Sequence, residues 1–197
     1  MKAFKNRLEE MAEATVNALD YSDSKVEYPD LSLVQKWPEE IILPLYALYK
    51  NAGYSELSSI LMYTQQQVRF EEIGELMLGI GLVEMVHYDK LGDFLLKASD
   101  IRSTNELTIN PSIKIGTFVE SALELALQAE KETLEEYKKV LSLINQEKYL
   151  EREDYVCTFD LISKFIADEE YHIILLGKAM RKDEEPKKKG KSITVIL

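Results

Sequence analysis

Residues 80–87 read Ile-Gly-Leu-Val-Glu-Met-Val-His, and residues 165–172 read Phe-Ile-Ala-Asp-Glu-Glu-Tyr-His. These two stretches contain the only histidines of the chain, and each histidine follows a glutamate by three positions. In a helix that spacing places both side chains on one face, one turn apart, where they can bind the same metal ion. The repeated Glu-x-x-His motif therefore predicts a metal centre between two helices.

Two more glutamates, Glu56 and Glu130, interrupt apolar helical patterns elsewhere in the chain. The residues four and seven positions away from each of them are all apolar, as expected for a helix face that packs on a core. Ionised carboxylates in an apolar interior are costly unless cations pair with them, and these stripes offer no lysine or arginine at the same levels. The sequence therefore predicts a two-metal centre, with the ligands Glu56, Glu84, His87, Glu130, Glu169 and His172.

Each of these residues also has a simpler interpretation, as a surface glutamate or as a core histidine with a hydrogen-bond partner. The spacing along the chain favours the metal centre. A helix rises about 1.5 Å per residue, so residues on antiparallel neighbours meet when they are equally far from the turn. Glu56 and Glu84 are centred on Phe70, and the other two glutamates are centred on the polar stretch Asn145–Asp154. Turns at these two places would bring all four glutamates to the same level along the bundle axis.

The composition predicts an all-α fold, because Leu, Ile, Glu, Lys and Ala dominate and the chain has only 8 Gly and 5 Pro among 197 residues. We predict four main helices, near 42–68, 71–98, 115–145 and 153–182. Two short turns and one long crossover, Ser99–Ile115, would let the third helix run parallel to the second. Pro44 suits the first turn of the first helix, whereas Gly53 is unfavourable inside it.

The predicted organisation has three parts. Residues 1–40 form an N-terminal helical extension, in which an amphipathic helix over Ala3–Leu19 is joined to the bundle by a polar segment; 41–182 form the four-helix bundle, and 183–197 a charged linker with a short apolar tail. The single cysteine, Cys157, excludes an intrachain disulfide and a four-cysteine metal site. The net charge of −11, with no basic face, argues against nucleic acid as a partner. Because no signal peptide or 18-residue apolar span is found, we expect a cytoplasmic protein that does not enter the membrane.

The motifs around the predicted ligands resemble those of the ferritin-like superfamily of di-metal carboxylate bundles, and of rubrerythrin in particular. They are Ala52-Gly-Tyr-Ser-Glu56 followed by Tyr63, Val83-Glu-Met-Val-His87, Glu130 followed by Tyr137, and Ala167-Asp-Glu-Glu-Tyr-His172. The resemblance covers roughly residues 42–180. It implies a ferritin-like four-helix bundle with one long crossover that assembles as a homodimer.

The sequence departs from the family pattern at three points. Rubrerythrins usually carry a rubredoxin module with four cysteines, which this chain cannot form, so a separate electron-donor protein would be needed. A further glutamate is common one turn after the third-helix ligand, where this chain has Thr133, and the six-ligand set is then more similar to bacterioferritin and manganese catalase. Bacterioferritins place an aspartate before both Glu-x-x-His motifs, whereas this chain has Val83 and Asp168. By that similarity Asp168 would orient His87; the alternative is a surface aspartate.

Carboxylate and imidazole ligands suit iron or manganese, so we expect two iron ions, with two manganese ions as the alternative. Our leading hypothesis is an oxidoreductase that reduces or dismutates hydrogen peroxide, with peroxide or dioxygen entering open positions on the ions. The alternatives are a protein that oxidises or stores iron and a non-enzymatic bundle stabilised by metal. Glu84 and Glu169 are expected to bridge the ions. Tyr63 and Tyr137 either line the site, as catalytic or hydrogen-bonding groups, or serve only as core aromatics.

Overall fold

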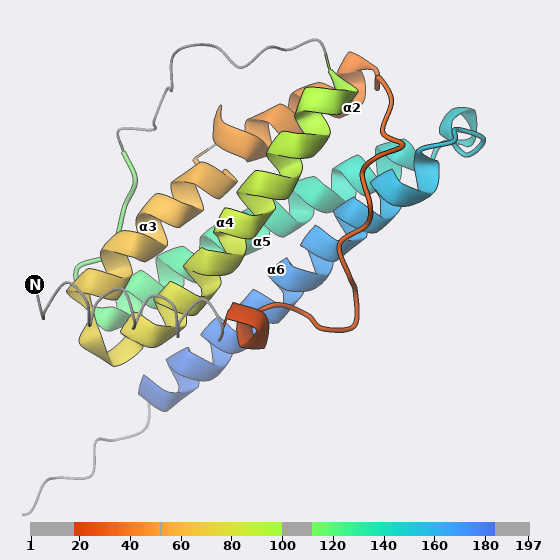
Figure 1. Cartoon of the computed structure of the whole chain (residues 1–197). Helices are drawn as coiled ribbons and strands as arrows, with labels where there is room; N and C mark the ends of the chain where they lie inside the picture. The colour runs from red at the N-terminus through yellow and green to blue at the C-terminus, as the bar shows by residue number, and fades with distance from the viewer. Residues whose placement is uncertain (1–17, 52, 100–111, 184–197) are drawn as a thin grey trace, which may run out of the picture.

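A computed structural model of the chain describes residues 18–51, 53–99 and 112–183. Within these residues it contains five α-helices and no strand, which confirms the predicted all-α fold. The helices are α2 (Glu39–Tyr46), α3 (Glu56–Arg69), α4 (Gly74–Ala98), α5 (Val119–Ile144) and α6 (Tyr155–Asp183). Figure 1 shows α3 to α6 packed side by side as a bundle, with α2 beyond the N-terminal end of α3. No helix in the described part of the chain is long and apolar enough to cross a membrane.

The bundle consists of two antiparallel hairpins, as the spacing of the glutamates predicts. α3 ends at Arg69, and the chain turns at Phe70 and a short 3-10 turn, Glu71–Ile73, before α4 begins. α5 and α6 are joined by residues 145–154. Gly81 allows close packing within the first hairpin, because a Cβ atom there would lie 3.1 Å from the Cβ of Tyr63.

The two hairpins are joined so that α4 and α5 run in the same direction (Figure 1). α4 ends at Ala98 and α5 begins at Val119, at the opposite end of the bundle. The predicted long crossover is therefore present, although most of it, residues 100–111, lies outside the described residues. Most of the expected N-terminal helix and the tail 184–197 also lie outside them.

The predicted single helix over 42–68 is wrong, because the structure divides it into α2 and α3. α2 begins at Glu39, so Pro44 lies inside the helix rather than in its first turn. A π-helical turn, Ala47–Asn51, follows. Proline cannot donate a backbone hydrogen bond and glycine disfavours the helical interior, so Pro44 and Gly53 on either side of the π-helical turn favour the interruption.

α3 begins at Glu56, so this predicted ligand stays in the bundle interior despite the break. Ser55 caps the new helix, and its hydroxyl accepts a hydrogen bond from the Ser58 N–H at 3.3 Å. The hydroxyl of Thr133 on α5 donates to the Tyr54 carbonyl at 2.8 Å and so ties the break to the neighbouring helix. Glu56 is thus the first residue of α3, where the positive end of the helix dipole favours a carboxylate.

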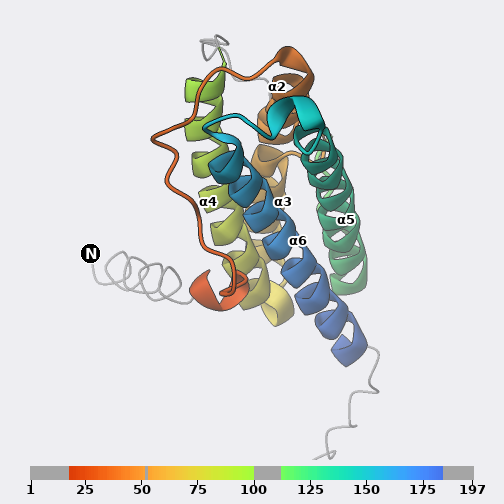
Figure 2. The same ribbon diagram turned by 90° about the vertical axis from the view of Figure 1, so that its right-hand side faces the viewer.

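In its described part the segment that precedes α2 is mainly extended. It begins with a 3-10 turn, Ala18–Tyr21, and residues 22–38, here called the N-terminal strap, then run back along the bundle beside α6 (Figure 2). Trp37 anchors its end, since its backbone N–H donates to the Ala98 carbonyl and its indole N–H donates to Asp154. The strap therefore contacts both hairpins.

Candidate metal centre

The four bundle helices bring all six predicted ligands together in the interior. The ligands are Glu56 on α3, Glu84 and His87 on α4, Glu130 on α5, and Glu169 and His172 on α6. All six residues are buried, with at most 1% of the surface of each residue exposed. Apolar helix faces that pack against one another thus enclose four carboxyl groups and two imidazoles.

The ligand atoms form two groups, and within each group they lie within 4.8 Å of one another. The first group is Glu56, Glu84, His87 and Glu169, and the second is Glu84, Glu130, Glu169 and His172. Glu84 and Glu169 belong to both groups, whereas the other carboxyl groups and the imidazoles belong to one each. This arrangement is suited to two ions that share two carboxylates.

Several of these atoms have no hydrogen-bond partner, which tests whether a metal would fit. His87 Nδ1 lies 3.6 Å from Glu56 Oε2 and 3.5 Å from Glu169 Oε1. All three atoms are buried and make no hydrogen bond within the described residues. Buried polar atoms are normally satisfied, and converging lone pairs are satisfied by a cation. The residues therefore fit a bound metal ion, and their oxygen and nitrogen donors suit iron or manganese.

Two buried tyrosines connect the helices that carry the unshared glutamates. Tyr63 on α3 donates its hydroxyl hydrogen to Glu130 on α5, and Tyr137 on α5 donates to Glu56 on α3. Burial and the adjacent carboxyl group raise the pKa of each phenol well above its ordinary value, so both tyrosines remain hydrogen-bond donors at neutral pH. Each tyrosine fixes one oxygen of an unshared glutamate, namely Oε1.

Asp168 lies behind His87 rather than on the surface. Its Oδ2 is 3.0 Å from His87 Nε2, and the aspartate is fully buried. Burial opposes the charge of Asp168, but hydrogen bonding to His87 and the ammonium of Lys164 outweigh burial and lower its pKa. An ionised acceptor at Nε2 favours the tautomer whose Nδ1 lone pair faces the other ligands.

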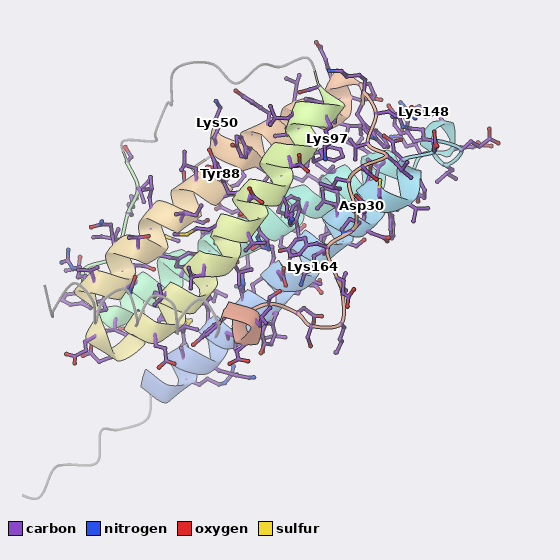
Figure 3. All side chains as sticks on the ribbon, viewed as in Figure 1. Asp30, Lys50, Tyr88, Lys97, Lys148 and Lys164 are labelled. Carbon is purple, nitrogen blue, oxygen red and sulfur yellow. The ribbon has the colours of Figure 1, made fainter. Side chains whose placement is uncertain are left out.

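Sequence reasoning missed the groups that surround Asp168. The expectation that the interior offers no cation near this level is wrong, because Lys164 is only 2% exposed and its Nζ lies 2.8 Å from Asp168 Oδ1. Lys164 lies where the N-terminal strap passes α6 (Figure 3). Its spacing of four residues before Asp168 is a helical ion-pair signal that the sequence contains. The sequence contains no comparable signal for the strap residues that donate hydrogen bonds to Asp168.

The metal-free centre retains protons that a cation would displace. Burial raises the pKa of Glu56 to about 8, and the charge of Glu84 adds to this effect. Burial also raises the pKa of Glu169, with Glu130 and Glu84 as further causes. Burial opposes a charge on His172, but the Glu130 carboxylate outweighs it and raises the pKa of the imidazole to about 9. Because metal ligands must be deprotonated, metal binding here would release protons.

The ferritin-like domain family matches residues 54–185, which is more than half of the chain and includes all six predicted ligands. The chain belongs to the ferritin-like family. A comparison with curated proteins finds no match. The match to this ferritin-like domain leaves out α2 and the N-terminal strap. It agrees with the helical bundle and with a buried carboxylate and histidine cluster that could hold metal, and it does not distinguish rubrerythrin from other ferritin-like proteins.

Proposed function

We propose that this ferritin-like protein is a dinuclear iron or manganese oxidoreductase that removes hydrogen peroxide. The observation that supports the proposal is the pair of ligand groups that share Glu84 and Glu169. A site for one structural ion needs only one such group. Two adjacent sites with shared carboxylates are suited to chemistry in which two electrons are exchanged at one place.

Each ligand has a distinct task under this proposal. Glu84 and Glu169 would bridge the two positions, while Glu56 with His87 and Glu130 with His172 would complete one position each. Each position has four protein side chains, and two of these are shared with the other position. They are too few to fill the coordination of either ion, which leaves room for a small oxygen substrate. A redox-active metal pair, when bound, would supply the electrons that oxygen chemistry requires.

The surrounding side chains keep the ligands in place and exclude bulk water. Tyr63 and Tyr137 hold one oxygen of Glu130 and of Glu56, so that the other oxygen of each carboxylate faces the site. We assign the two tyrosines this positioning role, in addition to their packing in the core. Asp168 does the same for His87 by holding its Nε2.

The reaction imposes a requirement on partners. Reduction of hydrogen peroxide to two waters consumes two electrons and two protons, whereas dismutation takes both electrons from a second peroxide molecule. Because the chain has one cysteine, these residues cannot hold a rubredoxin-type iron, and a peroxidase would take its electrons from a separate protein. By its resemblance to rubrerythrin we expect a homodimer, whereas a storage function would need a large hollow assembly.

The first test is elemental analysis of protein prepared without chelator or a metal-affinity tag. The proposal requires about two iron or two manganese ions per chain after anaerobic reconstitution, and no bound metal would overturn it. Peroxide consumption only with an added reductant would identify a peroxidase, and oxygen release without one would identify a catalase. Two ions without turnover of peroxide would refute the enzymatic proposal. A cage-sized mass in size-exclusion chromatography would then favour iron storage.

A further inference from the structure

The two imidazoles of the centre differ in what lies behind them. His87 Nε2 is 3.0 Å from Asp168, which is itself held by four donors. These are the Ser22 hydroxyl at 2.9 Å, the Asp23 backbone N–H at 2.6 Å, the Tyr28 hydroxyl at 3.1 Å and the Lys164 ammonium at 2.8 Å. Three of them come from the N-terminal strap, which the family match does not cover. The strap thus holds Asp168, which in turn fixes the orientation of His87, a candidate ligand of the first group.

His172 has no equivalent support. In the Glu-x-x-His motif of α6, Asp168 immediately precedes the glutamate and contacts the histidine of α4. Val83 occupies the same place in the motif of α4, and it is buried. Consistently, His172 Nε2 is buried and makes no hydrogen bond within the described residues. A valine side chain cannot accept a hydrogen bond from this nitrogen.

The difference affects metal binding because a histidine that binds an ion through Nδ1 carries its proton on Nε2. His87 Nδ1 faces Glu56 and Glu169, and its Nε2 is directed at Asp168. His172 Nδ1 faces Glu130 and Glu84, at 3.0 and 3.1 Å, and no described residue accepts a hydrogen bond from its Nε2. A buried donor without an acceptor costs free energy, which lowers the affinity of the His172 position for an ion.

We propose that the two metal positions are inequivalent: the strap-held Asp168 makes the His87 position bind its ion first and more tightly than the His172 position. This inference rests on the proposed two-metal function. The groups that hold a metal-binding histidine typically change metal affinity by about 10- to 100-fold. The two positions should differ by at least that factor.

The test is a Co²⁺ titration of the full-length, metal-free chain. Binding is measured by calorimetry and by the visible absorption of bound Co²⁺. Two shared carboxylates make even a symmetric centre fill in two steps, because the first ion reduces the negative charge that attracts the second. The variants therefore decide the question. Val83→Asn places an acceptor behind His172 without burying a charge, and should tighten the weaker step about 10-fold or more while leaving the tighter step unchanged. Val83→Ile is the matched control and should change neither step.

The reciprocal variant removes the support behind His87. Asp168→Val combined with Lys164→Met removes both members of the buried ion pair, so that neither charge is left unpaired. It should weaken the tighter step about 10- to 100-fold and leave the weaker step unchanged. A change in both steps alike, or no effect of Val83→Asn, would overturn the inequivalence while the two-metal proposal stands. Absence of Co²⁺ binding by the unmodified chain would overturn the two-metal proposal itself.

Discussion

Replacing a shared glutamate should remove both ions, whereas replacing an unshared one should remove a single ion. Glu169 belongs to both groups of ligand atoms, and Glu56 belongs to one. Burial raises the pKa of both carboxyl groups, which favours their neutral, protonated form in the metal-free protein. Glutamine is neutral and has nearly the shape of a protonated glutamate. Glu169→Gln and Glu56→Gln should therefore leave the metal-free fold intact and differ only in metal binding.

The size of the difference follows from mass action. An ion present at about 100 times its dissociation constant stabilises the folded state by about 2.7 kcal/mol, and one at about 1,000 times by about 4.1 kcal/mol. With the weaker position at the first ratio and the tighter one at the second, two ions add about 7 kcal/mol to the unmodified chain, of which about 2.7 kcal/mol remains in Glu56→Gln and about none in Glu169→Gln. For a chain of this size 1 kcal/mol shifts Tm by about 2–4 °C, so metal should raise Tm by about 14–28 °C, about 5–11 °C and about 0 °C respectively.

The assay is thermal unfolding by circular dichroism with and without Mn²⁺, combined with equilibrium dialysis to count bound ions. Glu170→Gln is the matched control, since Glu170 is adjacent to Glu169 but exposed, where it pairs with Lys138 at 3.0 Å. The control should bind two ions. If Glu169→Gln and Glu56→Gln lose the same number of ions, Glu169 is not shared. If Glu169→Gln keeps both ions, the proposed coordination is wrong.

Three further predictions follow from other parts of the structure. In the metal-free protein the raised pKa values of Glu56 (about 8, ordinarily 4.5) and His172 (about 9, ordinarily 6.5) mean that folding takes up protons. Its stability, measured by urea unfolding, should therefore fall with rising pH by about 1 kcal/mol per pH unit for each group, between pH 4.5 and 8 through Glu56 and between pH 6.5 and 9 through His172, and the stabilisation by metal should grow correspondingly. Tyr137→Phe removes the hydrogen bond to Glu56 and should weaken one step of a Co²⁺ titration about 10- to 100-fold, while equal weakening of both steps would contradict the assignment. Gly79→Ala should lower the free energy of unfolding by about 1–3 kcal/mol, because its Cβ would lie 2.4 Å from the Tyr21 ring, and unchanged stability would show that this contact yields easily.

Much of the bundle could be predicted because it depends on short-range periodicity. The apolar stripes and the polar stretches between them located α4, α5 and α6 to within a few residues and located both hairpin turns. Equal distances from those turns then brought the four glutamates to one depth. Because a helix has a fixed rise per residue, the number of residues between a side chain and the turn of its hairpin gives its position along the bundle axis.

The break between α2 and α3 was signalled but not resolved by the sequence. Gly53 indicates an interrupted helix, whereas Pro44 suited the first turn of the predicted helix, and neither residue shows whether Glu56 remains inside the bundle. The answer depends on Ser55 as a helix cap and on the hydrogen bond from Thr133, a residue that is remote in the chain. Only the packing of α5 against the break determines where α3 begins.

The sequence by itself determined the helical bundle and the six candidate ligands, because both are repeated patterns within single helices. Tertiary structure decided which candidate ligands belong to both groups, which tyrosine holds which glutamate, and that the N-terminal strap supports Asp168. Asp23 and Asp168 are separated by 145 positions. Contacts at such separations leave no periodic trace in a single sequence, since they depend on how whole helices and loops pack against one another.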